Sequence, residues 1–382
     1  MNIKKAVGYC TKRGKTRKQA LHLGVASLMI TFLLVLLGAG NTFAADVDVK
    51  ETQSNNDIET YLHELESDNS FGGIYYDGDT LIINYVKSSN SLAVPYGMVD
   101  VDIEYRAVEY PIRLLEEVKE YLIPMMDEYN IYMLDANEMT NQVDIALSDF
   151  SEEKQNNVIA LVNEQFGNTD FLNFINAEGY TVATTIAYEG SGGVASEEIA
   201  DLDIARSYFS AFSGMEIKVN SMYLTLGPAT SATQAYTAGH AFQGYGTVVC
   251  RRDVYVTNGV VEHCIGQGVG YLGNGHTDWA TISSNGSTFA PIVKTDSPTM
   301  GKPIYMWGAR SGITAGTITR TGISVGNLNG MCAGSYSCQQ GDSGAGIFDA
   351  QQSPSIAYGI QSGMGLINGT WVESYFSPFP VS

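Results

Sequence analysis

Long apolar runs are scarce in this chain of 382 residues. The longest, from about Val25 to Ala39, is short beside the roughly 20 residues that a bilayer-spanning helix needs. Seven basic residues and no acidic one precede it, and the small residues of Thr42–Ala45 follow it, which is typical of a secretory signal peptide. An uncleaved membrane anchor is the alternative. We expect residues 1–45 to be removed, leaving an extracellular product with no membrane partner.

Basic side chains are almost missing from residues 46–205, which hold 6 Lys plus Arg against 33 Asp plus Glu, a net charge of −27. Residues 206–382 hold 8 of each kind. We call these two stretches the acidic segment and the neutral segment. A break this sharp predicts two units. The lack of Lys and Arg argues against nucleic acid as a partner, because phosphate contacts need cationic side chains.

Cysteine is also sparse, with five residues, of which Cys10 lies in the expected signal peptide. The others all fall in the neutral segment: Cys250, Cys264, Cys332 and Cys338. An even number in an exported chain indicates disulfides, and of three possible connectivities we expect the local pairs Cys250–Cys264 and Cys332–Cys338. Zinc is the alternative for four cysteines, but without a C-x-x-C pair we expect no metal.

The two segments differ in their expected secondary structure. In the acidic segment, β-rich runs flank Asp77-Gly78, a strong hairpin signal. Strands at 101–110, 142–147 and 171–175 then alternate with helices at 111–128 and from Ser151, which predicts an α+β unit. The neutral segment has short runs of Val, Ile, Tyr and Thr between Gly, Asn and Ser turns, which predicts an all-β barrel or sandwich.

Three short motifs of the neutral segment together predict nucleophilic catalysis. Ser343 stands in Gly341-Asp342-Ser343-Gly344, where glycines allow a sharp turn and convergent N–H groups. His240 and Asp278 precede it by 103 and 65 residues. Alone, the serine string can be a turn, the histidine a buried structural group and the aspartate the end of a turn. In the order His, Asp, Ser they predict a triad of base, orienting acid and nucleophile.

These motifs carry a family resemblance. T-A-G-H ending at His240, D-x-A-x-I beginning at Asp278, and G-D-S-G around Ser343 are similar to the bacterial branch of the chymotrypsin family, close to α-lytic protease and the streptogrisins. The resemblance covers about residues 213–375 and implies a double β-barrel. With less specificity it extends to the acidic segment, where 72–83 and 143–147 resemble α-lytic-type pro-regions. Such a pro-region would assist folding of the protease and then inhibit it.

The resemblance also implies roles for further residues. Arg310, in a segment similar to the family's R-S-G-x-T-x-G, would pair with Asp342 and so support the nucleophile loop. The N–H groups of Gly341 and Ser343 would form the oxyanion hole. The strand holding Ser362, Gly363 and Met364 would bind extended substrate through its backbone. The protease would begin 30–35 residues before His240, near 205–212.

The sequence departs from this family at the cysteines and at the pocket. Ala241 replaces the cysteine usually found after the triad histidine, and Cys338 lacks its usual partner downstream of Ser343. Met364 stands where a glycine is common at the rim of the specificity pocket. No acidic residue lies just before Cys338, where a preference for Lys or Arg usually needs one. We therefore expect an uncharged residue on the acyl side of the cleaved bond.

The sequence predicts a secreted serine endopeptidase, made as a precursor and acting on polypeptides through His240, Asp278 and Ser343. It would need no cofactor or metal, and would be a monomer whose one protein partner, besides substrates, is its own pro-region. The expected units are a signal peptide (1–45), an α+β pro-region (46–205) and a chymotrypsin-like domain (206–382). An inactive homologue serving as a binding module and a secreted esterase are the alternatives.

Overall fold

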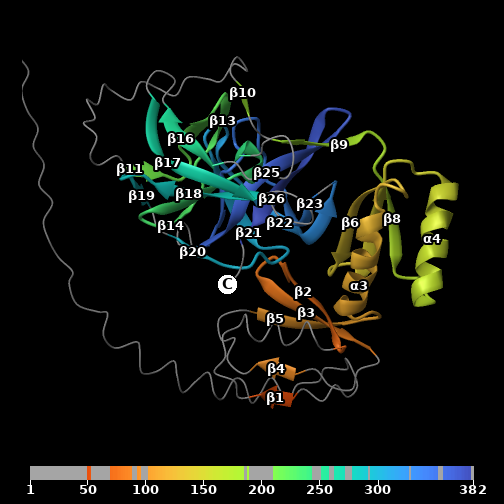
Figure 1. The fold of residues 1–382 in the computed structure, drawn as a ribbon. Helices are drawn as coiled ribbons and strands as arrows, with labels where there is room; N and C mark the ends of the chain where they lie inside the picture. The colour runs from red at the N-terminus through yellow and green to blue at the C-terminus, as the bar shows by residue number, and fades with distance from the viewer. Residues whose placement is uncertain are drawn as a thin grey trace, which may run out of the picture. The chain divides into compact units, whose positions relative to one another are not determined.

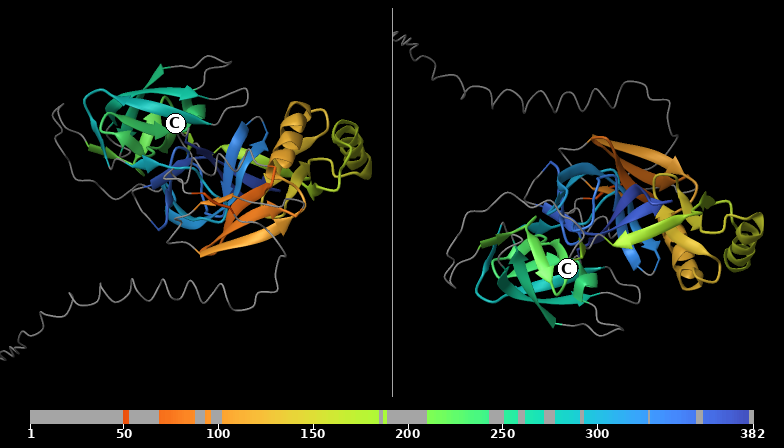
Figure 2. Two further views of the ribbon diagram at one scale, coloured as in Figure 1. Left: turned by 90° about the horizontal axis from the view of Figure 1, so that it is seen from below. Right: turned by 90° about the horizontal axis from the view of Figure 1, so that it is seen from above.

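The computed structural model describes part of the chain (Figures 1 and 2). The described ranges are 50–52, 69–87, 93–95, 102–184, 187–188, 210–242, 251–257, 262–271, 278–290, 293–326, 328–351 and 356–379. The expected signal peptide therefore lies outside them. Among the helices inside these ranges, none combines the length and the apolar character that crossing a bilayer requires.

The described part of the acidic segment contains both strands and helices. Its described strands are β1 (Lys50–Thr52), β2 (Phe71–Asp77), β3 (Thr80–Val86), β4 (Ala93–Pro95), β5 (Asp102–Val108), β6 (Ile131–Asn137), β7 (Gln142–Leu147), β8 (Leu172–Asn176), β9 (Tyr180–Thr184) and β10 (Ala187–Tyr188). Its helices are α3 (Ile112–Leu122), the 3₁₀ turn η1 (Ile123–Met125) and α4 (Glu152–Phe166). Several of these boundaries follow directly from local residues.

Helix α4 is delimited at both ends by local residues. The hydroxyl of Ser151 accepts a hydrogen bond from the Lys154 N–H at 3.4 Å, and Glu152 and Glu153 lie in the first turn, where the helix dipole favours negative charge. Gly167 ends the helix with φ 69°, a left-handed conformation that favours glycine. Helix α3 is shorter than the predicted 111–128, because Pro124 follows and interrupts regular α-helix.

Within its described residues, the neutral segment is built of strands with one short 3₁₀ turn, η2 (Gly239–Phe242). The strands are β11 (Ser210–Phe212), β12 (Glu216–Val219), β13 (Met222–Thr225), β14 (Ala229–Ser231), β15 (Gln234–Thr237), β16 (Arg251–Thr257), β17 (Glu262–Tyr271), β18 (Trp279–Ser284), β19 (Thr288–Ala290), β20 (Lys294–Thr295), β21 (Pro303–Gly308), β22 (Gly312–Val325), β23 (Leu328–Gly334), β24 (Gly346–Asp349), β25 (Ile356–Ile367) and β26 (Thr370–Pro378).

These strands form two large sheets. One has eight strands in the order β10-β13-β12-β16-β17-β18-β15-β14. The other runs β21-β24-β25-β26-β23-β22-β6-β7-β8, and a further pairing of β21 with β22 joins the two ends of its first six strands. The protein is thus mostly β, and each sheet has its own apolar core, one around Phe242 and Ile282 and one around Tyr336 and Phe376. The predicted pair of closed barrels stays a prediction.

Strands of the acidic segment complete both sheets. Strand β6 pairs antiparallel with β22 (Leu134↔Ser324 and Met133↔Val325), so β6, β7 and β8 extend the second sheet. Strand β9 pairs antiparallel with β25, and β10 pairs antiparallel with β13 of the first sheet. The sequence-based strand predictions leave out β6, although this strand provides one of the backbone connections between the acidic and neutral segments.

Candidate active site

One strand pairing and one inter-strand connection bring the predicted triad together. His240 lies in η2, immediately after β15, and Asp278 directly precedes β18. Because β15 and β18 are paired, with Thr237 opposite Ala280, the histidine and the aspartate meet at the same end of the sheet. Ser343 comes from the connection between β23 and β24 of the other sheet. The site is therefore assembled where two sheets face each other, from residues that are distant in sequence.

Close polar contacts link the three side chains of the predicted triad. Ser343 Oγ lies 3.1 Å from His240 Nε2, and His240 Nδ1 is in short contact with Asp278 Oδ2. The other carboxylate oxygen of Asp278 accepts a hydrogen bond from the His240 backbone N–H at 2.7 Å. Asp278 thus fixes both the ring and the main chain of the histidine, which leaves Nε2 facing the hydroxyl as the position of a general base.

Asp278 is buried, but its carboxylate is well supplied with hydrogen-bond donors. Burial by itself would raise its pKa; the charge of His240 and the hydrogen bonds from His240 and Ser362 outweigh this, so the pKa lies below the usual value. Sequence reasoning assigned Ser362 only a backbone role toward substrate. In the structure its hydroxyl also donates to Asp278 Oδ2, and this side-chain contact had no sequence signal.

The nucleophile loop is held by Asp342, with one correction to the expected contacts. The guanidinium of Arg310 does not pair with Asp342 but with Glu216 at the start of β12. Asp342 instead accepts hydrogen bonds from the backbone N–H groups of Arg310 (2.9 Å), Ser311 (3.0 Å) and Gln339 (2.9 Å), and from the Ser311 hydroxyl. Because these amides already surround the buried carboxylate, the Arg310 side chain is free to reach Glu216.

Glycine is required on both sides of the nucleophile. Gly341 has φ 103°, and a Cβ there would lie 2.3 Å from Arg310 Cγ. Gly344 has φ 89°, and a Cβ there would lie 2.1 Å from the hydroxyl oxygen of Thr237. No described residue accepts a hydrogen bond from the Gly341 N–H. This agrees with a role in which that N–H is kept for a bound oxyanion.

Thr225, at the end of β13, is a part of the site that sequence reasoning missed. Its N–H donates to the Ser343 carbonyl at 2.7 Å, and its hydroxyl donates to the Gly341 carbonyl at 2.8 Å. The same hydroxyl accepts from the Ala309 N–H at 3.0 Å. A threonine in a short β-run has no distinguishing sequence context, so its contact with the nucleophile loop could be found only from the fold.

The predicted substrate strand lies beside the nucleophile. Ser343 Oγ is 3.4 Å from the Ser362 carbonyl, and Gly363 and Met364 continue along β25. Behind this strand the buried Tyr336 donates to the side-chain oxygen of Gln361 at 2.6 Å, and the Gln361 amide donates to Cys338 Sγ at 3.2 Å. Met364 packs against the apolar core that contains Tyr336 and Cys338. These neighbours are uncharged.

The cysteine prediction is wrong for one pair. Cys332 and Cys338 are separate buried thiols, so the expected disulfide between them is not formed. Cys332 lies within β23, whereas Cys338 lies beyond that strand and accepts hydrogen bonds from Gln361 and from the Ser374 hydroxyl. Burial raises the pKa of each thiol to about 12, so both stay protonated at neutral pH. Cys250 lies outside the described residues, and the pair Cys250–Cys264 stays a prediction.

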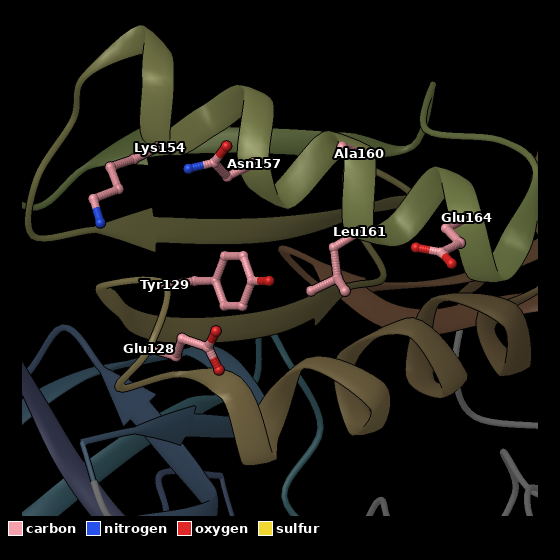
Figure 3. Close-up of a pocket in the computed structure, with 7 residues that line it drawn as sticks. All are labelled: Glu128, Tyr129, Lys154, Asn157, Ala160, Leu161 and Glu164. Carbon is pink, nitrogen blue, oxygen red and sulfur yellow. The ribbon is translucent and has the colours of Figure 1, made fainter.

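A hollow of about 410 Å³ is lined by residues that are distant in sequence from the predicted triad. Residues from the α3–β6 connection and from α4 line it: Glu128, Tyr129, Lys154, Asn157, Ala160, Leu161 and Glu164 (Figure 3). Charged groups of both signs face it, and no residue of the predicted triad or of the substrate strand contributes to its wall. The hollow therefore adds nothing to the chemistry of Ser343.

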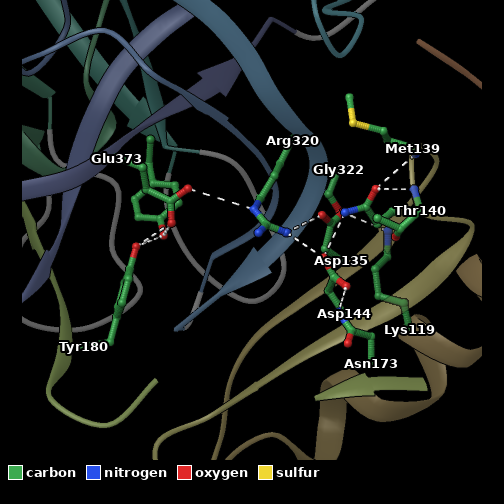
Figure 4. Close-up of polar contacts among 12 residues, drawn as sticks. Lys119, Asp135, Met139, Thr140, Asp144, Asn173, Tyr180, Arg320, Gly322 and Glu373 are labelled. Atoms are coloured by element: carbon green, nitrogen blue, oxygen red, sulfur yellow. Dashed lines mark hydrogen bonds and ion pairs between the residues drawn. The ribbon is translucent and has the colours of Figure 1, made fainter. Parts of the chain in front are cut away.

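A second buried polar cluster joins the acidic segment to β22 (Figure 4). Arg320 of β22 contacts Asp135 of β6 at 2.8 Å and Asp144 of β7 at 3.0 Å. Desolvation raises the pKa of Asp135 to about 6; Arg320 opposes this increase and neighbouring Asp144 adds to it. Lys119 of α3 also reaches across, donating to the Gly322 carbonyl at 3.0 Å. We call Asp135, Asp144 and Arg320 the seam cluster.

Comparison with known proteins finds neither a matching family model nor a matching curated protein. Among solved structures, the chain is similar to Cellulomonas bogoriensis chymotrypsin, with 20% identity over 44% of this chain and 92% of that chain and a TM-score of 0.35. It is also similar to Thermobifida fusca Protease A (20% identity, 44% and 92%, TM-score 0.34) and to Deg5 (13%, 43% and 82%, TM-score 0.30). Likenesses of this size do not place the chain in a family.

Proposed function

We propose that this protein is a secreted serine endopeptidase that is made as a precursor. The observation that carries the proposal is the contact of Ser343 Oγ with His240 Nε2 at 3.1 Å, while the opposite ring nitrogen of His240 contacts the buried carboxylate of Asp278. A serine hydroxyl becomes a useful nucleophile only when a base can take its proton. Here the base and its orienting acid are both in place.

The reaction is acyl transfer to Ser343. Its Oγ attacks the carbonyl carbon of a peptide bond, and His240 takes the hydroxyl proton and passes it to the leaving amine. Water then attacks the acyl-enzyme, with His240 again acting as the base. Asp278 stays ionised, consistent with its lowered pKa, and stabilises the imidazolium. The N–H groups of Gly341 and Ser343 receive the oxyanion, a contribution of about 3–4 kcal/mol for a single such donor.

The acidic segment acts as the pro-region in this proposal, assisting folding of the protease and inhibiting it afterwards. Two contacts support this. Strand β6 adds its backbone hydrogen bonds to β22, and β9 adds its own to β25, the strand that carries Ser362 and Gly363. A strand paired with β25 there excludes another extended peptide from the same edge. Substrates have an uncharged residue before the cleaved bond, since uncharged Tyr336, Gln361 and Cys338 lie behind the substrate strand.

A fluorophosphonate probe and a peptide library test the function. We expect the processed secreted protein to be labelled at Ser343, and the Ser343→Ala variant to remain unlabelled. The labelled enzyme should digest casein and cleave the library after uncharged residues. Labelling without casein digestion would indicate an esterase, no labelling of the processed protein would indicate a binding module, and strict cleavage after Lys or Arg would overturn the expected specificity.

A further inference from the structure

Two facing residues of the first sheet reach toward the loop that carries Ser343. Glu216 of β12 lies directly opposite Thr225 of β13, so the two side chains project from the same face of that sheet. The Thr225 hydroxyl donates to the Gly341 carbonyl at 2.8 Å. Glu216 forms an ion pair with the guanidinium of Arg310. This pair of residues therefore connects the first sheet to two residues, Gly341 and Arg310, that belong to the second half of the site.

The side chain of Arg310 lies directly against Gly341. A Cβ at residue 341 would be 2.3 Å from Arg310 Cγ, 3.0 Å from its Nε and 3.2 Å from its Cδ. The stem of the arginine therefore occupies the space beside the Gly341 Cα in which another residue would carry its side chain. Because glycine restricts φ and ψ less than any other residue does, the position of the Gly341 peptide depends on the groups that pack against it.

The ion pair with Glu216 determines where this arginine stem lies. The contact is made by Arg310 Nη2, and the two side chains are only 18% and 21% exposed. Arg310 Nε is buried and has no hydrogen-bond partner among the described residues. An unpaired buried donor costs about 1–3 kcal/mol, so the pairing with Glu216, and not a contact of Nε, keeps the guanidinium in this position. Without the carboxylate, the guanidinium would turn toward water and its stem would leave Gly341.

The position of Gly341 matters because its N–H is the donor assigned to the oxyanion. Thr225 fixes the Gly341 carbonyl, and backbone N–H groups fix the carboxylate of the next residue, Asp342. No described residue accepts a hydrogen bond from the Gly341 N–H itself. A donor of this kind accelerates the reaction only if it already points at the place where negative charge develops. A small displacement of Gly341 would therefore slow the chemical step without altering the substrate strand β25.

We propose that Glu216 is a positioning residue for the oxyanion hole: it keeps Arg310 against Gly341 and thereby keeps the Gly341 N–H directed at the oxyanion. Glu216 acts through Arg310 and is not itself a catalytic residue. The two facing residues of the first sheet have separate tasks, since Thr225 fixes the carbonyl of Gly341 and Glu216, through Arg310, fixes its Cα side. The inference rests on the proposed protease function and adds to it a residue of the first sheet.

Steady-state kinetics of the processed secreted protein give the first test, with a chromogenic peptide anilide that carries an uncharged residue before the cleaved bond. In Glu216→Ala we expect kcat to fall about 100-fold and KM to change little, because loss of one oxyanion donor costs about 10²- to 10³-fold in kcat. Glu216→Gln keeps an oxygen that can accept from Arg310 Nη2, so its kcat should fall only about tenfold. A raised KM with unchanged kcat would overturn the proposal, since Glu216 would then support substrate binding.

A transition-state analogue distinguishes positioning from a general loss of structure. A peptidyl trifluoromethyl ketone labelled with ¹³C forms a hemiketal with Ser343, and NMR follows the ionisation of the hemiketal oxygen in the oxyanion hole. The pH at which this oxygen loses its proton should be higher by about 2 in Glu216→Ala and by about 1 in Glu216→Gln, because a tenfold weaker stabilisation corresponds to one pKa unit. Misfolded molecules bind no inhibitor and cannot move this pH. Ionisation at the parent pH in a variant of low kcat would overturn the proposal.

Asp349→Asn is the matched control, because it neutralises the acid of another largely buried ion pair of the neutral segment. Asp349 at the end of β24 lies 3.9 Å from Lys302, with side chains that are 3% and 21% exposed, and it also accepts a hydrogen bond from the Tyr358 hydroxyl. The control should keep the kcat of the parent and the same pH of hemiketal ionisation. An equal fall of kcat in Asp349→Asn and Glu216→Gln would overturn the proposal, since any broken ion pair would then have the same effect.

The outcomes separate this inference from the proposed function. A parent that is labelled at Ser343 and cleaves the anilide, together with an unchanged kcat in Glu216→Ala, would overturn the inference alone. A parent that is neither labelled nor able to cleave would overturn the proposed function and the inference with it. Thermal unfolding compares the variants with the parent. If Glu216→Ala does not fold, Glu216→Gln, which replaces one oxygen by an amide nitrogen, provides the same two measurements.

Discussion

Two buried aspartates, Asp278 in the triad and Asp135 in the seam cluster, differ in the direction of their pKa. Asp278 accepts hydrogen bonds on both oxygens, and its pKa is lowered although burial acts to raise it. Asp135 shares the Arg320 guanidinium with Asp144, and its Oδ1 has no hydrogen-bond partner among the described residues. Burial dominates there, and its pKa rises to about 6. Both carboxylates are buried, so the charges and hydrogen-bond donors around each one, and not the depth of burial, set the direction in which its pKa moves.

The largest expected effect comes from replacing Asp278, the aspartate whose pKa is lowered. Asp278→Asn should slow casein digestion about 10⁴-fold, because an amide favours the wrong tautomer of His240. The measurement is the rate of casein digestion by the processed protein. Asp135→Asn serves as the matched control and should leave that rate within a few-fold. An equal loss in both variants would mean that the two aspartates act through folding.

The next largest expected effect is a loss of stability when Arg320 of the seam cluster is replaced. Arg320→Met leaves Asp135 and Asp144 buried without their cation, and we expect a loss of about 3–5 kcal/mol in the free energy of unfolding. The measurement is urea unfolding of the full-length Ser343→Ala chain at pH 7.5. Adding Asp135→Asn to Arg320→Met should recover part of the loss, because one uncompensated charge is removed. Equal stability of the Arg320→Met chain and its parent would show that the cluster contributes no net stability.

The seam cluster also predicts a pH dependence. The pKa of Asp135 is higher in the folded chain than its usual 3.8, so the folded state binds the proton more tightly. Its contribution to stability is complete below about pH 4 and is lost as pH rises through about 6. The full size is about 3 kcal/mol, since one pKa unit corresponds to about 1.4 kcal/mol.

Unfolding of the Ser343→Ala chain at several pH values between 4 and 7.5 measures this contribution. Arg320, Asp144 and Lys119 are the charged groups that act on Asp135. Asp135→Asn should flatten the curve between pH 4 and 6.5. A variant whose curve stays parallel to that of its parent would assign the dependence to other groups.

Sequence reasoning found what depends on local motifs and missed what depends on tertiary pairing. The triad could be named because His240, Asp278 and Ser343 each stand in a short, distinctive string, and the β2–β3 hairpin because Asp77-Gly78 demands a turn. Strand β6 was missed because its pattern shows no clean alternation, with Asp135 buried within it. Its partner is β22, nearly 200 residues away in sequence, and no local pattern encodes that pairing.

The same distinction explains the two corrected contacts. The resemblance paired Arg310 with Asp342, and the two residues are indeed neighbours, but the contact runs through the Arg310 backbone N–H. Whether a side chain or a main chain satisfies a buried carboxylate depends on loop geometry. Cys332 and Cys338 are close in sequence, yet Cys338 Sγ is occupied by Gln361 and Ser374. Spacing alone carries no information about the direction of either side chain.

The smallest expected effect concerns Ser362, the donor that Asp278 has and Asp135 lacks. Ser362→Ala removes one hydrogen bond to a buried carboxylate, worth about 1.5–3 kcal/mol. We expect casein digestion to slow about tenfold, because His240 is less firmly oriented. Ser335→Ala is the control: it removes a serine hydroxyl that accepts a hydrogen bond from the Thr317 N–H at 3.0 Å and does not touch Asp278, and it should digest casein at the parent rate.

Acid unfolding separates an effect on Asp278 from general damage around Ser362. Asp278 has a lowered pKa when folded, so its contribution to stability is present above its unfolded pKa and is lost as pH falls through the folded value. Without the Ser362 hydroxyl that folded value rises, and the loss on acidification, measured in the Ser343→Ala background below pH 4, becomes smaller. A Ser362→Ala chain that is less stable by the same amount at every pH would show that the hydroxyl acts only through packing, because only a bond to the charged carboxylate makes the difference depend on pH.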